Sequence, residues 1–342
     1  MARPERGVAA PGWEEVGLVH QSLPELALHQ IDLSTSLAGI HLPNPVIINA
    51  MTGGAPAVAA INRDLSAVAA ELNMAMAVGS QTAGLKESEV AGTYRVVREV
   101  NPDGVIIANL SADATLETAK RAVDMVEADL LQIHLNAPQE LVMAEGDRDF
   151  RGQLKRIEQL VRNLPVGVIV KETGFGLARE AVRTLYAVGV RAVDVSGRGG
   201  TNFAWIESER RGQEIDPGLL EWGNPTAACL AEVAALGYPD LDIIASGGIA
   251  RGSQVAKALC LGAKAAGLAG AVLTRHQDGG RDAVRQYLLG VLRDLSTAML
   301  LTGAQNLTAL QTKPVIITGS TGEWCKLRGV DLNRLACRSG AC

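Results

Sequence analysis

No basic cluster occurs in this chain of 342 residues, which has 32 lysines and arginines against 37 aspartates and glutamates. The formal net charge is therefore -5. A protein that binds a polynucleotide along its phosphates shows a basic patch or stripe. We therefore expect nucleic acid not to be a partner.

Long hydrophobic runs are also missing, and aromatic residues make up only 3% of the chain. No uncharged apolar run reaches the roughly 18 residues that a membrane-spanning helix needs. The first residues, MARPERGVAAPGWEE, lack the apolar core of a secretory signal. These absences predict a cytoplasmic protein without a membrane span.

Cysteine is sparse, with five residues and no paired short spacings. Such an odd, scattered set is not the disulfide framework of a small secreted protein. We expect all five to be reduced thiols. Cys337 and Cys342 could form a metal or redox pair, but because no candidate ligands lie near them in the sequence we favour their interpretation as ordinary tail residues.

Apolar residues make up 47% of the chain, which is enough for a sizeable core. Eight short apolar runs recur, each followed by a Gly, Ser or Asn turn and then by a helical pattern. The seven steps between positions 46 and 265 average about 31 residues, which suits one strand, one helix and two short loops. The runs lie at 46–51, 74–79, 105–110, 130–136, 166–172, 192–197, 242–248 and 265–270.

Eight such units predict an α/β fold that closes into a (β/α)8 TIM barrel, with a doubly wound open sheet as the alternative. We expect residues 46–303 to form the barrel, 1–45 to close its bottom with a strand or hairpin, and 304–342 to be a C-terminal extension. The sixth and seventh runs start 50 residues apart. Because the excess follows the C-terminal end of the sixth strand, we expect it to form a lid or substrate wall.

The fourth predicted strand carries polar side chains. Period-two alternation places Gln132, His134 and Asn136 on one face. A histidine and an asparagine at the C-terminal end of an inward-facing strand favour a functional over a purely structural role. Gln139 and Glu140 lie just beyond, where a carboxylate can hold Mg²⁺ against a substrate phosphate.

The fifth and sixth strands add charged and hydroxyl groups. Lys171 is in register with Gly167 and Ile169 and is expected to face inward. A buried ammonium group needs a partner, which is either a carboxylate in a structural pair or an anionic ligand such as a flavin ring or a phosphate. Asp194 and Ser196 share one face of the next strand.

Small residues end the seventh and eighth strands, each before a predicted helix. They are Ser246, Gly247 and Gly248 on one strand and Ala269 and Gly270 on the other. Small residues let the backbone approach an anion, and a helix N-terminus favours negative charge. We expect a phosphate site here, although the same glycines could simply relieve crowding.

Glycines and small polar residues also end the first three strands. A flat ring bound over the barrel mouth would need such uncrowded strand ends. Gly199, Gly200 and Thr201 follow the sixth strand, where backbone N–H groups could approach a phosphate or merely form a turn. The residues at the ends of the first three strands are Thr52, Gly53, Gly54, Ser80 and Asn109.

Eight segments, in order, resemble the type 2, flavin-dependent isopentenyl diphosphate isomerases, and the match runs from about Val19 to about Gly303. HLNxxQE followed by EGDRxFxG is specific to that family, whereas SGGIxxGxxVAKALxLGA is shared with many FMN barrel enzymes. The resemblance implies an FMN-binding (β/α)8 barrel. The segments are INAMTGGA, AVGSQ, QIHLNAPQE, EGDRDFRG, VKETGFG, GRGGTNFAWIE, EWGNPTA and IASGGIARGSQVAKALCLGA.

The resemblance also implies roles for single residues. His134 and Asn136 would meet the substrate diphosphate, Gln139 would lie beside the substrate's double bond, and Glu140 would bind Mg²⁺. We take His134, Asn136 and Gln139 as the catalytic and substrate-binding residues. The implied cofactor residues are Thr52, Ser80, Asn109, Lys171 and Thr201 at the flavin ring and ribityl chain, Gly247, Gly248, Ala269 and Gly270 at its phosphate, with Gly53, Gly54 and Ser196 beside them.

The implied reaction is the 1,3 proton shift that converts isopentenyl diphosphate into dimethylallyl diphosphate, with reduced FMN, Mg²⁺ and NADPH as the reductant. The resemblance further implies a homo-oligomer, either a tetramer or an octamer. One alternative is an FMN-dependent oxidoreductase of the 2-hydroxy acid oxidase type, which needs an inward His and Arg pair. The only histidine past His134 is His276, after the eighth strand, where it is badly placed. Another alternative is a flavin-binding homologue that is not catalytic or has a different substrate.

The chain departs from the family near its start. Family members carry an Arg-Lys-x-x-His run that closes over the diphosphate. Here Arg6 matches the arginine and is a predicted substrate-binding residue, but Gly7 replaces the lysine and no histidine precedes His20. Because charge-assisted bonds to phosphate are worth roughly 1.5 to 3 kcal/mol each, we expect a KM for isopentenyl diphosphate at least about tenfold above that of relatives with the full run.

Overall fold

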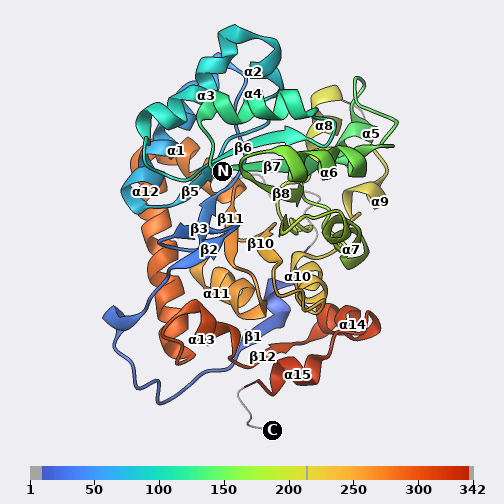
Figure 1. The fold of residues 1–342 in the computed structure, drawn as a ribbon. Coiled ribbons are helices and arrows are strands. Elements are labelled where there is room, and N and C mark those ends of the chain that lie inside the picture. The colour runs from blue at the N-terminus through green and yellow to red at the C-terminus, as the bar shows by residue number, and fades with distance from the viewer. Residues whose placement is uncertain (1–9, 213–214, 339–342) are drawn as a thin grey trace.

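A closed barrel of eight parallel strands forms the centre of the protein in the computed structural model, which describes residues 10–212 and 215–338 (Figure 1). The last strand hydrogen-bonds to the first, so the predicted (β/α)8 barrel is confirmed and the open-sheet alternative is wrong. Each strand starts within one residue of the start of a predicted run, and several strands end two or three residues before the run does. The strands are β4 (Val46–Ile48), β5 (Ala75–Ala77), β6 (Ile106–Ser111), β7 (Leu130–Leu135), β8 (Gly167–Glu172), β9 (Ala192–Asp194), β10 (Asp242–Ser246) and β11 (Ala265–Leu268).

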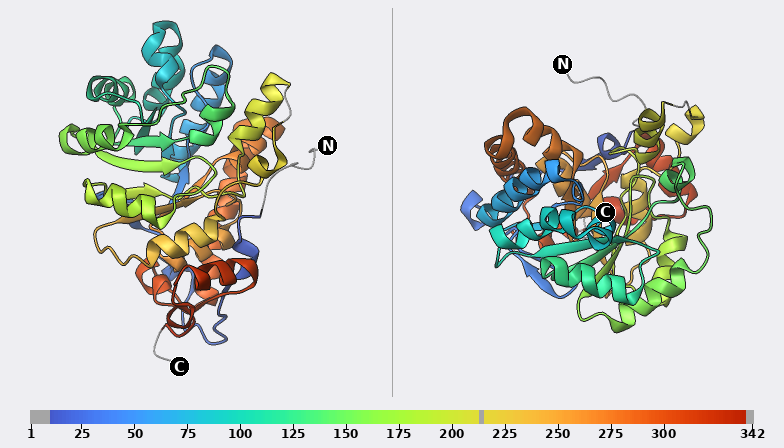
Figure 2. Two further views of the ribbon diagram at one scale, coloured as in Figure 1. Left: turned by 90° about the vertical axis from the view of Figure 1, so that its right-hand side faces the viewer. Right: turned by 90° about the horizontal axis from the view of Figure 1, so that it is seen from above.

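Helices surround the strands (Figure 2). The main helices are α1 (Ala59–Leu72), α2 (Thr82–Lys86), α3 (Ser88–Val100), α4 (Leu116–Val126), α5 (Ala137–Val142), α6 (Gln153–Asn163), α7 (Arg179–Ala187), α8 (Phe203–Arg211), α9 (Pro217–Leu220), α10 (Thr226–Ala234), α11 (Gly252–Leu261) and α12 (Gly270–Leu301). The flanking elements are η1 (Trp13–Glu15), β1 (Val16–Leu18), η2 (Leu28–Gln30), β2 (Thr35–Leu37), β3 (Ile40–Leu42), η3 (Pro56–Val58), α13 (Leu307–Gln311), β12 (Val315–Ile317), α14 (Gly319–Leu327) and α15 (Leu332–Ala336).

The hairpin of β2 and β3 packs against the N-terminal end of the barrel. Its leucines, Leu37 and Leu42, are buried in one apolar cluster with inward-facing strand residues such as Ile107 and Ile169. The backbone N–H at the hairpin turn donates to Asp242 Oδ2, at the start of β10, over 2.7 Å. Apolar side chains therefore fill this end of the barrel, and the polar residues are left at the other end.

The segments before and after the barrel pair with each other near the bottom of Figure 1. Strand β1 runs antiparallel to β12. The carboxylate of Glu15 accepts hydrogen bonds from the backbone N–H groups of Ser320, at 2.9 Å, and Thr321, at 2.7 Å, in the first turn of α14. A carboxylate at a helix N-terminus satisfies free N–H groups and complements the helix dipole. Glu15 thus joins the two flanking segments.

Three of the cysteines, Cys229, Cys260 and Cys325, are buried free thiols. Cys337 is disulfide-bonded, so the prediction of a reduced thiol is wrong at that position. The spacing of cysteines along a sequence does not show which sulfur atoms meet in space, and this explains the error. Cys342 lies outside the described residues. Within 10–212 and 215–338, no helix combines the length and the apolar character needed to cross a membrane.

We expect Glu15→Gln to lower the free energy of unfolding by about 1 kcal/mol, because a neutral amide accepts these hydrogen bonds less strongly. The hydrogen bonds to Thr321 and Ser320 hold the pKa of Glu15 below its usual range. Its stabilisation is therefore present above the unfolded pKa and is lost as the pH falls through the folded pKa. Urea unfolding at neutral and acidic pH measures this. The exposed Glu14→Gln is the control, and an equal effect of both changes would contradict the assignment.

Candidate active site

A buried ion pair lies in the barrel interior. Lys171 is 7% exposed, and Asp194 is fully buried. The Lys171 Nζ atom lies 3.6 Å from Asp194 Oδ2 and donates to Ser196 Oγ at 3.1 Å and to the backbone carbonyl of Glu172 at 2.8 Å. Of the two kinds of partner expected for this lysine, the structure shows the carboxylate.

Asp194 is also the centre of a wider polar network. Its carboxylate accepts from Asn49 Nδ2 at 2.9 Å and from Ser246 Oγ at 2.8 Å. Asn49 Oδ1 accepts in turn from Gln132 Nε2 at 3.1 Å. Gln132 is fully buried, and its Oε1 has no hydrogen-bond partner among the described residues. A buried unpaired oxygen calls for a donor, which a bound ligand can provide.

His134 points toward the neighbouring strand β6. Its Nδ1 lies 2.8 Å from Asn109 Oδ1, and Asn109 Nδ2 donates to the carbonyl of Val78 at 3.2 Å. The asparagine oxygen therefore faces the ring, and Nδ1 carries the proton. Burial, assisted by the nearby charge of Lys171, lowers the pKa of His134 to about 4. At neutral pH the imidazole is thus uncharged, and its Nε2 is an acceptor.

We expect His134 to titrate near pH 4 in the protein alone and at a higher pH with bound inorganic diphosphate, because a nearby anion favours the imidazolium form. NMR titration of histidine-labelled protein measures both values, and His134→Asn assigns the signal. The exposed His29 provides an internal control, because its NMR signal should not respond to added diphosphate. An unchanged His134 pKa at saturating diphosphate would place that anion elsewhere.

The chain passes from β7 directly into α5, which carries Gln139. Asn136 Nδ2 donates to Gln139 Oε1, and Gln139 Nε2 donates to Glu207 Oε1 at 2.9 Å. Glu207 is 6% exposed and lies on α8, in the insertion after the sixth strand, beside α5 (Figure 1). Arg210 Nε donates to the other carboxylate oxygen of Glu207 at 2.7 Å. Both ends of the Gln139 amide are therefore held.

Sequence reasoning missed Glu207, Asn49 and Gln132 as members of this network. Glu207 lies within the GRGGTNFAWIE segment, and only its place in an insertion at the C-terminal end of the barrel hinted at a role. Asn49 was visible as an amide that ends an apolar run. Gln132 was placed correctly on the inward face, but it was given no role.

Glu140 follows Gln139 on α5 and is partly exposed. Its Oε2 accepts from the backbone N–H of Asp147 at 3.0 Å, and the Arg148 guanidinium donates to the carbonyl oxygens of Glu140 and, at 2.6 Å, of Met143. The EGDR segment thus folds back onto the end of α5. In the part of the chain that the structure describes, no three His, Cys, Asp or Glu side chains cluster as a metal site. Mg²⁺ commonly needs only one or two carboxylates plus substrate phosphates and water, so Glu140 alone fits.

Glu172 supports the loop that follows β8. Its Oε2 accepts from the backbone N–H groups of Gly174, at 2.7 Å, Phe175, at 2.5 Å, and Gly176, at 2.9 Å. Burial raises the pKa of Glu172 to about 6, while these three hydrogen bonds act in the opposite direction. The hydrogen bonds to Glu172 therefore stabilise the turn formed by the VKETGFG segment.

The glycine turns after β9 and β10 lie against each other. Gly247 and Gly248 have φ angles of 99° and 68°, and a Cβ on Gly247 would lie 2.3 Å from the carbonyl oxygen of Gly197. Glycine at position 247 therefore avoids a steric clash with the neighbouring turn. A Cβ on Gly200 would lie 2.9 Å from the backbone nitrogen of Gly248, so the glycine at 200 also keeps that N–H accessible. Both expected roles of these glycines are compatible with this geometry.

The rim after β4 and β5 packs around Tyr94. Thr52 Oγ1 donates to Asn62 Oδ1 at 2.6 Å, and a Cβ on Gly53 would lie 2.1 Å from the Tyr94 ring. The Tyr94 hydroxyl donates to the carbonyl of Ser80 at 2.5 Å. Burial raises the pKa of Tyr94 to about 12, so the hydroxyl stays a neutral donor. The residue ties the two rim loops together.

The remaining predicted residues are placed as follows. Gly54 lies in the same rim, where a Cβ would approach the Tyr94 hydroxyl to 2.8 Å. Thr201 Oγ1 lies 3.6 Å from the position of a Cβ on Gly270, and Ala269 caps the start of α12. Arg6 lies outside the described residues.

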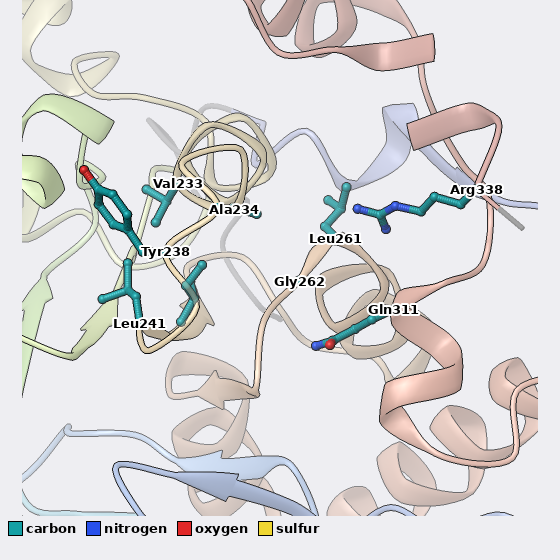
Figure 3. Close-up of a pocket in the computed structure, with 10 residues that line it drawn as sticks. Val233, Ala234, Tyr238, Leu241, Leu261, Gly262, Gln311 and Arg338 are labelled. Atoms are coloured by element: carbon teal, nitrogen blue, oxygen red, sulfur yellow. The ribbon is translucent and has the colours of Figure 1, made fainter. Parts of the chain in front are cut away.

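A separate cavity of about 260 Å³ lies between α10 and α11 (Figure 3). Its lining includes Tyr238, Leu241, Leu261, Gln311 and Arg338. It shares no residue with the network at the strand ends. The candidate site therefore rests on the barrel mouth and not on this cavity.

Residues 107–317 match the family described as FMN-dependent dehydrogenase. A protein of Symbiobacterium thermophilum named isopentenyl-diphosphate delta-isomerase is 63% identical over 340 residues, which cover 98% of this chain and 94% of that protein. This chain belongs to the type 2, FMN-dependent isopentenyl-diphosphate delta-isomerase family. A Bacillus pumilus isopentenyl-diphosphate delta-isomerase is 46% identical over 332 residues, or 97% of this chain and 93% of that protein.

Solved structures similar to this isomerase-family chain include a flavocytochrome and an oxidase. A flavocytochrome b2 variant with bound sulfite has a TM-score of 0.68 at 19% identity and covers 96% of this chain and 79% of its own. A mandelate oxidase variant with an FMN adduct has a TM-score of 0.66 at 16% identity and covers 90% of each chain. At such identities the likeness shows the fold alone, whereas the named isomerases favour the isomerase over the oxidase alternative.

Proposed function

We propose that this protein converts isopentenyl diphosphate into dimethylallyl diphosphate with reduced FMN and Mg²⁺. The carrying observation is the Gln139 amide, held between Asn136 and Glu207 next to the single carboxylate of Glu140, in a chain with named isomerase relatives. The reaction adds a proton to the terminal CH₂ and removes one from C2, so it has no net redox change. A site that orients an alkene between a neutral amide and a metal-bound diphosphate suits that requirement.

The chain's own residues fit FMN. Among the described residues, Gln132 Oε1 is a buried acceptor without a hydrogen-bond partner, the Gly248 N–H has no acceptor, and Lys171 is a buried cation. When bound and reduced, FMN supplies the electron density that stabilises a cation-like alkene carbon. The residues proposed to hold it are Thr52, Gly53, Gly54, Ser80, Asn109, Lys171, Ser196, Thr201, Gly247, Gly248, Ala269 and Gly270.

The remaining roles fall to the residues around α5. His134 and Asn136 would bind the diphosphate, and Glu140 would hold Mg²⁺ against it. Gln139 is a neutral amide whose orientation is set on both sides, so it would position the double bond. Helix α8 would cover this side of the mouth and exclude water. NADPH as reductant, a tetrameric or octameric assembly and a cytoplasmic location stay predictions.

The geometry disfavours a 2-hydroxy acid oxidase. That chemistry needs an inward histidine to take a hydroxyl proton, but the His276 Nε2 atom is hydrogen-bonded to Asp64 Oδ2 at 2.8 Å, a contact between α12 and α1. This places His276 in the helical layer. The other histidine candidate, His134, is bound to Asn109 and has a lowered pKa.

Anaerobic turnover of isopentenyl diphosphate tests the proposal. The purified protein should be yellow or take up FMN, and dimethylallyl diphosphate should form with Mg²⁺ only after the flavin is reduced. NMR of the products in D₂O follows the proton exchange. Equal turnover with oxidised flavin, or flavin reduction by a 2-hydroxy acid, would contradict the proposal.

We expect Glu140→Gln to lower kcat/KM at least about tenfold and to remove its dependence on Mg²⁺, because an amide is a weaker ligand than a carboxylate. FMN content should not change. Titration of activity with Mg²⁺ measures the effect, and Glu158→Gln on α6 is the matched control. Full, Mg²⁺-dependent activity in Glu140→Gln would move the metal site elsewhere.

A further inference from the structure

Trp13 lies outside the barrel sequence yet touches the glycine turn after β10. The side chain is fully buried, and its indole N–H donates to the carbonyl oxygen of Gly247 at 3.4 Å. On the other side, Lys257 of α11, the helix that follows this turn, donates to the backbone carbonyl of Trp13 at 2.7 Å. The residue is therefore held between the turn and its helix.

The same N-terminal segment packs on both glycine turns. A Cβ on Gly199 would lie 2.3 Å from Pro11 Cβ, and a Cβ on Gly248 would lie 2.7 Å from the same atom. The backbone N–H of Ala227 donates to the Pro11 carbonyl at 3.0 Å. Glu15 and β1 bind this segment to α14 and β12. The N-terminal segment is therefore held in place by contacts on several sides.

The hydrogen bond from Trp13 determines the direction of one particular N–H group. The Gly247 carbonyl and the Gly248 N–H belong to one planar trans peptide, so they point in opposite directions. Both residues are glycines with positive φ, and glycine adopts several backbone conformations at little cost. Without a hydrogen bond to the Gly247 carbonyl, this peptide would be free to rotate. The Trp13 indole N–H donates that hydrogen bond.

The opposite side of the peptide carries the Gly248 N–H group. Glycine at position 200 leaves the space in front of the Gly248 nitrogen free of a side chain. Among residues 10–212 and 215–338, no group accepts a hydrogen bond from the Gly248 N–H. A backbone N–H in such a turn before a helix suits a phosphate oxygen.

We propose that Trp13 is a positioning residue for the cofactor phosphate, because its indole N–H orients the Gly247–Gly248 peptide so that the Gly248 N–H faces that phosphate. The assignment rests on the proposed FMN site. It predicts that Trp13 matters for a flavin with a phosphate and not for one without.

Trp13→Phe keeps an aromatic ring and removes the indole N–H. The variant and wild-type proteins, stripped of flavin, are titrated with FMN and with riboflavin, which lacks the phosphate, and quenching of flavin fluorescence is measured. We expect the Kd for FMN to rise about three- to tenfold, the effect of one hydrogen bond, while the Kd for riboflavin stays within about twofold.

Trp324→Phe is the matched control, because it also removes an indole hydrogen bond, here to Glu232 Oε1 at 2.7 Å and not to the glycine turn. Both Kd values should stay as in wild type. Gly200→Ala is a second test that does not depend on Trp13, since its Cβ would fill the space before the Gly248 nitrogen. It should weaken FMN and spare riboflavin.

The outcomes separate this inference from the proposed function. If Trp13→Phe binds FMN as tightly as wild type, or weakens FMN and riboflavin equally, the positioning role is overturned and the cofactor stands. If the wild-type protein binds neither flavin, the proposed function falls, and the role of Trp13 falls with it. A loss confined to FMN in both Trp13→Phe and Gly200→Ala supports the proposal.

Discussion

The buried pair of Lys171 and Asp194 is the interaction on which the barrel mouth depends. Taking an isolated charge out of water is costly, so each of these groups needs the other, and the remaining carboxylate lone pairs need donors. Asn49, which directly follows β4, and Ser246, at the end of β10, supply those donors. Residues in or next to β4, β8, β9 and β10 are thereby connected inside the barrel. This network supports the neighbouring side chains that are proposed to bind the ligands.

The barrel interior has two layers with different tasks. The hairpin leucines and the inward-facing isoleucines fill the N-terminal end with apolar side chains, and this burial stabilises the closed sheet. The polar layer lies at the C-terminal end, where hydrogen bonds satisfy its amides and carboxylates almost completely. The exceptions, Gln132 Oε1 and Asn136 Oδ1, are unpaired among the described residues. A bound flavin or substrate is proposed to supply the missing hydrogen-bond donors.

The site is completed by segments that are not part of the eight repeated units. Helix α8, in the long loop after β9, brings Glu207 to Gln139, and the N-terminal segment brings Trp13 to the glycine turn. The pairing of β1 with β12 and the carboxylate of Glu15 on α14 hold that segment in place. Barrel enzymes vary their chemistry through such additions, since the strands themselves are occupied with closing the sheet. In this protein the additions act on the orientation of groups rather than on the barrel.

The sequence by itself determined the eight strands, the closed barrel and the inward faces of Gln132 and Lys171, because side chains alternate with period two and apolar runs mark strands locally. The resemblance of its motifs also determined the family. Only the tertiary structure decided that Glu207 meets Gln139, that Asn49 and Ser246 share Asp194, that His134 is neutral and that Trp13 anchors Gly247. These contacts join residues between 52 and 234 positions apart. Residues so far apart in the sequence come into contact only when the whole barrel forms. The protonation state of His134 depends on the burial that results from folding.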